Sequence, residues 1–209
     1  MLNTNDMKYF SYKIEHDYGL APNPFHGYCT LAVCKSSIRS NKNLEIGDWI
    51  IGTGSKTLGN LHELIFAMRL EEKITLNEYW QDIRFTKKKP IVNGSLVQMY
   101  GDNFYHQDKD SGEWIQENSA HSLADGSTNN GHLKRDTGGE FVLISKEFYY
   151  FGSKSPLVPD EYLEVCSEGR DMKSVSIPIE TANKFITWLK TNYTVGNHGD
   201  PTSWKEHLK

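Results

Sequence analysis

The sequence predicts an α+β fold, in which short buried strands are accompanied by a few helices. Two strongly apolar runs, Cys29–Cys34 and Trp49–Ile51, are each bounded by turn-forming or charged residues, which is typical of buried strands. Apolar side chains at helical spacing predict one clear helix over Thr181–Tyr193, with Thr181 as the candidate cap. Together these patterns indicate a sheet-containing core with helices outside it.

The remaining elements are predicted from local residue patterns along the chain. Apolar or aromatic runs predict strands at Tyr9–Ile14, Leu64–Leu70, Leu96–Tyr100, Phe141–Ile144 and Phe148–Phe151, the last two as a hairpin. A helical turn is expected over Ser36–Asn41 and a short helix over Thr75–Gln81. A turn at Asp110–Gly112 predicts a second hairpin, which pairs Phe104–His106 with Trp114–Gln116.

The length of the chain favours one domain over residues 1–209. A chain of 209 residues can bury a sizeable core, and no linker rich in proline, serine or glycine divides it. The polar stretch from 117 to 139 has few apolar residues to anchor it, so it predicts a long loop that is either functional or disordered. The tail after Gly196 is also expected to be irregular.

Charge and cysteine content narrow the function classes. A net charge of −4 argues against tight, sequence-blind binding along a phosphate backbone, so any contact with nucleic acid must be local. The three cysteines are an odd number without a CxxC motif, which argues against a disulfide framework and a structural zinc site and fits a reducing compartment. No run approaches membrane-spanning length, so we expect a soluble, cytoplasmic protein without a membrane partner.

The stretch Asp17–Gly59 predicts a functional site at the ends of core strands. Two prolines stiffen the loop that contains Asn23, which precedes the first apolar run. Lys35 and Arg39 follow that run, four residues apart, and can share one face of a helical turn. Strands hold geometry while loops carry chemistry, so these polar groups are candidate ligand contacts.

The run Gly52–Thr57 resembles a phosphate-binding loop only superficially. The Walker pattern requires a Gly-Lys step, and Ser55 interrupts that step before Lys56. A triphosphatase is therefore disfavoured. A tight turn whose amides, together with Ser55 and Lys56, face a phosphate or a base edge is still an open interpretation.

The run Tyr100–His106 concentrates side chains that can hold a base. Asp102 and Asn103 can hydrogen-bond to a base edge, while Tyr105 can stack on its ring and His106 adds an imidazole. A hairpin turn with a half-buried aromatic face explains the same residues equally well.

Metal and thiol chemistry receive weaker support. Cys34 beside Lys35 could be an activated nucleophile, because a neighbouring cation lowers the pKa of a thiol, but burial as a small apolar side chain is the commoner role. His106, His121 and Asp136 could meet in space, yet the histidines lack the spacing of metal ligands, so scattered surface histidines are favoured. No metal is predicted, and the sequence identifies no cofactor.

Several motifs taken together resemble a known family. They are PNPF at Pro22–Phe25, CTLAVCK at Cys29–Lys35, Ile38-Arg39, GDWIIGTGS at Gly47–Ser55, YGDN at Tyr100–Asn103 and the YFGS that ends at Ser153. These resemble the second class of nucleotide-modification-associated domains, which are found in bacteria and phages, over almost the whole chain. The resemblance implies a role in modifying or handling nucleobases, with a nucleotide or modified nucleic-acid base as ligand and other proteins of a modification system as partners.

A second likeness is architectural. The order of a strand, a helical turn, the GDW strand, another strand and a short helix containing Tyr79 looks like that of PUA-like domains, including the EVE, YTH and ASCH types. This likeness implies a mixed, β-barrel-like sheet with peripheral helices and an aromatic-lined pocket for a base. The chain departs from the pattern in its Pro22–Pro24 loop and its long polar stretch.

Two functional hypotheses follow, and both place the candidate residues around one ring-lined hollow. The first is a binding module for a nucleobase or nucleotide, in which Trp49 or Tyr105 stacks on the base and Asn23, Asp102 or Asn103 contacts its edge. The second is an enzyme that modifies the base or nucleotide by acid–base chemistry, with Asp17 or Asp102 as base, His106 or His121 as acid, and Lys35 with Arg39 on a phosphate.

Overall fold

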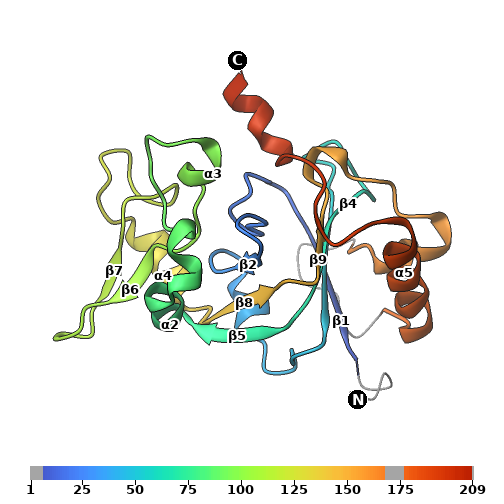
Figure 1. The fold of residues 1–209 in the computed structure, drawn as a ribbon, viewed down its shortest axis with the longest axis horizontal. Helices are drawn as coiled ribbons and strands as arrows, with labels where there is room; N and C mark the ends of the chain where they lie inside the picture. The colour runs from blue at the N-terminus through green and yellow to red at the C-terminus, as the bar shows by residue number, and fades with distance from the viewer. Residues whose placement is uncertain (1–6, 168–176, 209) are drawn as a thin grey trace. The chain divides into compact units, whose positions relative to one another are not determined.

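The prediction of an α+β fold is confirmed. The computed structural model describes residues 7–167 and 177–208, in which strands alternate with short helices (Figure 1). The chain divides into two compact units. The strands lie in sheets of five, three and two strands that are not closed into a barrel. The sequence predicts a barrel-like sheet, whereas the described residues form separate open sheets.

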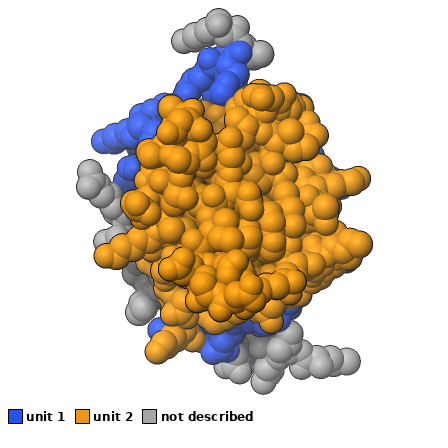
Figure 2. All heavy atoms as spheres, turned by 90° about the vertical axis from the view of Figure 1, so that its left-hand side faces the viewer, with its two compact units in different colours: residues 1–17, 43–71, 145–209 blue, residues 18–42, 72–144 orange. Residues whose placement is uncertain are grey.

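Unit 1 comprises Met1–Asp17, Asn43–Glu71 and Ser145–Lys209, coloured blue in Figure 2. Its sheet has the order β1-β3-β4-β9-β10, with bounds β1 Tyr9–Lys13, β3 Trp49–Thr53, β4 Leu64–Arg69, β9 Phe148–Tyr150 and β10 Gly196–Asn197. β3 pairs in parallel with β1 and antiparallel with β4. Because β3 and β4 are apolar nearly throughout, they are central strands buried on both faces.

Helix α5, Ile179–Asn192, packs its apolar stripe on the core of unit 1. Phe185, Ile186 and Leu189 lie on that stripe, as their helical spacing predicts. The helix begins two residues before the predicted cap Thr181, because Pro178 already supplies the backbone geometry of an N-cap. The described residues of the unit also contain the short 3-10 helices η3 Gly152–Lys154, η4 Asp160–Val165 and η5 Thr202–Leu208. The last of these lies in the tail that the sequence predicts to be irregular.

Unit 2 comprises Tyr18–Lys42 and Glu72–Ile144. Its larger sheet has the order β2-β8-β5, with β2 Cys29–Leu31, β8 Phe141–Ser145 and β5 Glu72–Thr75. The predicted hairpin is confirmed, since β6, Tyr105–Gln107, pairs antiparallel with β7, Trp114–Gln116. The helices are α1 Ser36–Arg39, α2 Leu76–Gln81, α3 Leu96–Met99, α4 Asn130–Thr137 and the 3-10 helix η2 Ile83–Lys88.

Three local predictions are wrong, each for a physical reason. The predicted strand Leu96–Tyr100 is helix α3, because Ser95 and Gln98 form a reciprocal capping box. β8 and β9 are not a hairpin, since they pair in different sheets. The polar stretch from 117 to 139 is not a continuous loop, because Asn129 caps helix α4 by accepting from the amides of Gly131 and His132.

Among residues 7–167 and 177–208, no helix combines the length and apolar character needed to cross a membrane.

Candidate active site

Cys34 lies where the chain leaves strand β2 and enters helix α1, in a strained backbone conformation. Its φ is 53° and that of Lys35 is 37°, so two successive non-glycine residues occupy the left-handed region. Each such residue costs on the order of 1–3 kcal/mol and is kept only where neighbouring contacts fix it. The side chain of Cys34 is partly exposed, whereas Cys29 and Cys166 are buried.

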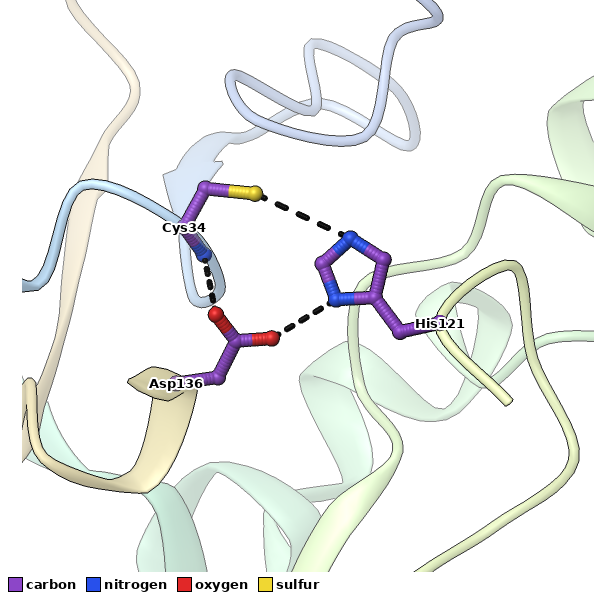
Figure 3. A group of neighbouring side chains, drawn as sticks. All are labelled: Cys34, His121 and Asp136. Carbon is purple, nitrogen blue, oxygen red and sulfur yellow. Dashed lines mark hydrogen bonds and ion pairs between the residues drawn. The ribbon is translucent and has the colours of Figure 1, made fainter. Parts of the chain in front are cut away.

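His121 and Asp136 meet Cys34 in unit 2 and form a continuous line of contacts with it (Figure 3). Sγ of Cys34 lies 3.7 Å from Nε2 of His121, and Nδ1 of the same ring lies 2.6 Å from Oδ2 of Asp136. We call these three residues the thiol triad. A nucleophile next to a base that is itself oriented by a third group is the arrangement of covalent catalysis.

The Asp136 carboxylate is buried and fully hydrogen-bonded. Oδ1 accepts from the amide of Cys34 and from Nε of Arg135, both at 3.0 Å, while Oδ2 accepts from Tyr105 at 3.1 Å and from His121 at 2.6 Å. Burial raises the pKa of Asp136, but the hydrogen bonds and charges of His121 and Arg135 outweigh burial and hold the pKa well below its usual range. Asp136 is therefore a carboxylate at neutral pH.

This carboxylate fixes the proton on one side of the His121 ring. Because Asp136 can only accept, Nδ1 carries the hydrogen, and Nε2 of the neutral ring turns its lone pair toward the Cys34 thiol. Burial lowers the pKa of His121, but its hydrogen bonds to Asp136 and Cys34 outweigh burial and raise the pKa to about 9. The imidazole is thus a base strong enough to take the thiol proton.

Arg39 holds the two sides of the triad together. It is fully buried, and its guanidinium donates to three backbone carbonyls: Cys34 and Phe141, each at 2.9 Å, and Asp136. Burial lowers the pKa of Arg39 to about 10, against the attraction of Asp136, so it is still a cation. A Cβ on Gly139 would overlap this guanidinium, which explains the glycine there.

A hairpin residue fixes the rest of the site. Gln116 on β7 donates to the hydroxyl of Tyr105 at 3.0 Å and to the carbonyl of His121 at 3.2 Å. Its side-chain oxygen accepts from the amide of Asn129, the cap of α4. Gln116 therefore anchors the polar stretch after β7 at two points, His121 and the N-terminal end of helix α4, which carries Asp136.

The same three residues could be considered as metal ligands, since a sulfur, a nitrogen and an oxygen lie within 4.8 Å of one another. Nε2 of His121 faces Cys34 while Nδ1 faces Asp136, so the carboxylate bonds to the side of the ring away from the sulfur. The four hydrogen bonds of Asp136 also occupy its acceptor positions. The geometry is that of a nucleophile, base and orienting carboxylate.

Three predicted site residues form a separate buried network in unit 2. Oδ1 of Asn23 accepts from Nζ of Lys88 at 2.6 Å, and Asp102 accepts from Thr30 at 2.6 Å and Tyr79 at 2.8 Å. Asn103 donates to the backbone of Tyr79. Burial lowers the pKa of Lys88 to about 8 and raises that of Asp102. Asn23 and Asp102 are hydrogen-bonded within this network, whereas Oδ1 of Asn103 is buried without a partner among the described residues. The network therefore supports the fold in this conformation.

The other predicted residues of unit 2 differ in their distance from the triad. Tyr105 donates directly to Asp136, and burial followed by the Asp136 charge raises the pKa of its phenol. Lys35 adjoins Cys34 in sequence and is partly exposed. His106 instead stacks on Trp80 and lies 2.8 Å from Glu117.

Four predicted residues belong to unit 1. Asp17 is buried and accepts from Tyr150 at 2.6 Å and from the amide of Thr202 at 2.9 Å, so it anchors the C-terminal segment. Trp49 lies in the core, Ser55 caps its own turn by accepting from the amide of Leu58, and Lys56 is exposed. The predicted residues thus belong to several separate sets of contacts.

The sequence predicts His121 as a catalytic residue but does not place Cys34 or Asp136 among the site residues. Cys34 ends an apolar run, and its position at the exit of that run was the available signal. Asp136 lies in a stretch without apolar periodicity, where the spacing of His121 and Asp136 indicates no shared element. Only the capped helix α4 brings the carboxylate to the histidine.

Comparison with known proteins identifies a family for nearly the whole chain. A family model described as nucleotide modification associated domain 2 matches residues 6–208. No match was found to a curated protein or to a solved structure.

Proposed function

Because the chain belongs to the family of nucleotide modification associated domain 2, we propose that it is a thiol-dependent enzyme that acts on a nucleobase or nucleotide. The observation that supports this proposal most directly is the line of contacts from Cys34 through His121 to Asp136. The family name supports the substrate class, and the thiol triad supports the proposed chemistry. The strained backbone at Cys34 supports the same conclusion, because such strain clusters at active sites.

The proposed reaction proceeds through a covalent intermediate on Cys34. Nε2 of His121 accepts the thiol proton, and the thiolate sulfur attacks an electrophilic carbon of the substrate to form an S–C bond. The imidazolium then donates this proton to the group that leaves the carbon. In the second half, His121 takes a proton from water, the water oxygen attacks the same carbon, and the S–C bond breaks. The proton returns to the Cys34 sulfur, which restores the enzyme.

The alternative, a module that only recognises a base in an aromatic-lined pocket, receives less support. Its proposed stacking residues, Trp49 and Tyr105, are each 1% exposed. A ring face that already packs in the protein cannot stack on a base without leaving its place. Recognition of the base is then a step of the enzymatic cycle rather than the whole function.

The proposal is tested by the nucleoside composition of cells that carry the protein. We expect deletion of the gene in its host to change the mass-spectrometric profile of DNA nucleosides or free nucleotides, and wild type to restore it. Cys34→Ala should leave the product below about one hundredth of the wild-type level, because removal of a nucleophile costs on the order of a thousandfold or more in rate.

Cys29→Ala is the matched control, because it removes a buried thiol from the same unit. It should restore the profile as wild type does. Full restoration by Cys34→Ala would show that the thiol is dispensable and would exclude the proposed mechanism.

A further inference from the structure

Helix α4 places two more nitrogen-bearing side chains beside the thiol triad. Arg135 shares the Oδ1 atom of Asp136 with the amide of Cys34, so its guanidinium lies close to the nucleophilic residue. The ring of His132 meets that of His121 edge-on, with the ring centres 4.3 Å apart. His132 precedes Arg135 by three residues and Asp136 by four, so all three lie on neighbouring positions of one helix surface.

Both side chains keep donors or acceptors that the described part of the chain does not use. Arg135 bonds to Asp136 through Nε, and among residues 7–167 and 177–208 its two terminal nitrogens have no hydrogen-bond partner. Its side chain is 45% exposed, so these nitrogens can reach a ligand. Nδ1 of His132 is buried and likewise has no partner within those residues. A buried polar atom without a partner is costly unless a ligand satisfies it.

The local charge is positive, although the whole chain carries −4. The pKa of His121 is raised to about 9 by its hydrogen bonds to Asp136 and Cys34 against the effect of burial, and when the ring takes the Cys34 proton, as proposed, the charges of this pair cancel. Arg135 and the buried Arg39 then supply two positive charges against the one negative charge of Asp136. Burial, followed by repulsion from His121 and Arg135, lowers the pKa of His132, which is the direction expected beside two cations. An anion bound beside Arg135 and His132 would neutralise this excess of positive charge.

We propose that Arg135 and His132 form an anion subsite next to Cys34, which binds the phosphate of a nucleotide substrate. The terminal nitrogens of a guanidinium donate two parallel hydrogen bonds that fit the oxygens of a phosphate, and the imidazole adds a third contact. The net negative charge of the chain disfavours tracking along a polymer, which favours a free nucleotide as the substrate. This inference rests on the proposed function and names its substrate class.

The subsite is tested with two small alkylating agents that differ in charge. Iodoacetate is an anion and iodoacetamide is neutral, so the ratio of their rate constants at Cys34 measures anion binding beside the sulfur. We expect this ratio to exceed that of N-acetylcysteine amide by about tenfold. Arg135→Gln should lower the ratio at least about fivefold, and His132→Gln should also lower it. Peptide mapping assigns the label to Cys34.

Lys134→Gln is the matched control. It removes the same charge from the neighbouring, exposed position of α4, and it should leave the ratio within about twofold of wild type. Because Arg135→Gln also removes a hydrogen bond to Asp136, both rate constants can change, but their ratio cancels a change in the thiol itself. A wild-type ratio in Arg135→Gln, or an equal fall in Lys134→Gln, would overturn the subsite.

A protection experiment identifies the ligand class. The four deoxynucleoside 5′-monophosphates should slow alkylation of Cys34 by iodoacetamide, whereas the matching nucleosides at equal concentration should not. Equal protection by nucleosides would overturn the phosphate assignment, and protection only by an oligonucleotide would overturn the free-nucleotide assignment. If Cys34 reacts with iodoacetamide no faster than N-acetylcysteine amide at pH 6, the proposed function fails; a reactive Cys34 without preference for iodoacetate overturns the subsite alone.

Discussion

Asp136→Asn is expected to slow the alkylation of Cys34 by iodoacetamide at pH 7 by on the order of 100-fold. The carboxylate keeps the Nδ1 proton on His121 and raises the pKa of the ring against burial. An amide removes this charge, so burial then dominates and His121 no longer accepts the thiol proton. The rate constant is measured by mass spectrometry of the Cys34 peptide, while the buried Cys29 and Cys166 serve as internal references.

A second variant separates this chemistry from damage to the fold. Asp136 also accepts from the amide of Cys34 and from Tyr105, so its replacement loosens the site. His121→Gln leaves those two contacts in place and should slow the reaction to a similar extent. Asp125→Asn, an exposed change in the same polar segment, should have no effect. Wild-type rates in a folded Asp136→Asn or His121→Gln protein would contradict the triad assignment.

Arg39→Met is expected to lower the free energy of unfolding by about 3 kcal/mol or more. The change removes the donor of the Cys34 and Phe141 carbonyls and one of the donors of the Asp136 carbonyl, which keeps the amide of Gly139, and each group left unsatisfied costs about 1–3 kcal/mol. Urea unfolding followed by circular dichroism measures the loss. Because Arg39 ties Cys34 to helix α4, alkylation of Cys34 should slow as well.

Lys42→Met provides the control for this variant, since it removes an exposed cation close to Arg39 in the chain. Its free energy of unfolding should stay within about 0.5 kcal/mol of wild type. An Arg39→Met protein as stable as Lys42→Met would mean that the guanidinium does not support the site.

The sequence predicts those elements whose pattern is local. β3 and β4 are continuous apolar runs, and α5 carries apolar residues at helical spacing, so each is recognisable without its neighbours. The β6–β7 hairpin is equally local, since its turn and both strands lie within a short segment. The existence of these elements and the α+β class are therefore confirmed.

Strand pairing and helix capping are harder to predict. Strand pairing depends on residues far apart in the sequence, and capping depends on one or two side chains. Phe141–Ser145 and Phe148–Tyr150 look like one hairpin, yet β8 pairs with β5 and β9 with β4. The strand predicted at Leu96–Tyr100 is a helix, because the capping box outweighs the apolar run. The open sheets, in place of a barrel, follow from strand pairings that no single segment specifies.

The site was only partly predictable for the same reason. Residue type alone makes His121 a candidate. The role of Cys34 as a nucleophile, however, depends on the His121 ring, 87 positions away, and on the Asp136 carboxylate, 102 positions away. Neither separation has a spacing rule, unlike a helical pair or a metal-binding motif. The sequence also does not distinguish Asp102 from Asp136, since both are aspartates in polar surroundings. In the structure, Asp102 is hydrogen-bonded to Thr30 and Tyr79 in a separate network.

The rate constant for alkylation of Cys34 by iodoacetamide between pH 5 and 10, divided by that of N-acetylcysteine amide at each pH, tests the thiol triad most directly. His121 is protonated below a pKa of about 9, so its cation stabilises the thiolate there and is lost as the pH rises through that value. We expect the ratio to be on the order of ten or more at pH 6 and to fall toward one above pH 9. A ratio near or below one across the whole range would contradict the assignment of Cys34 as a nucleophile activated by His121.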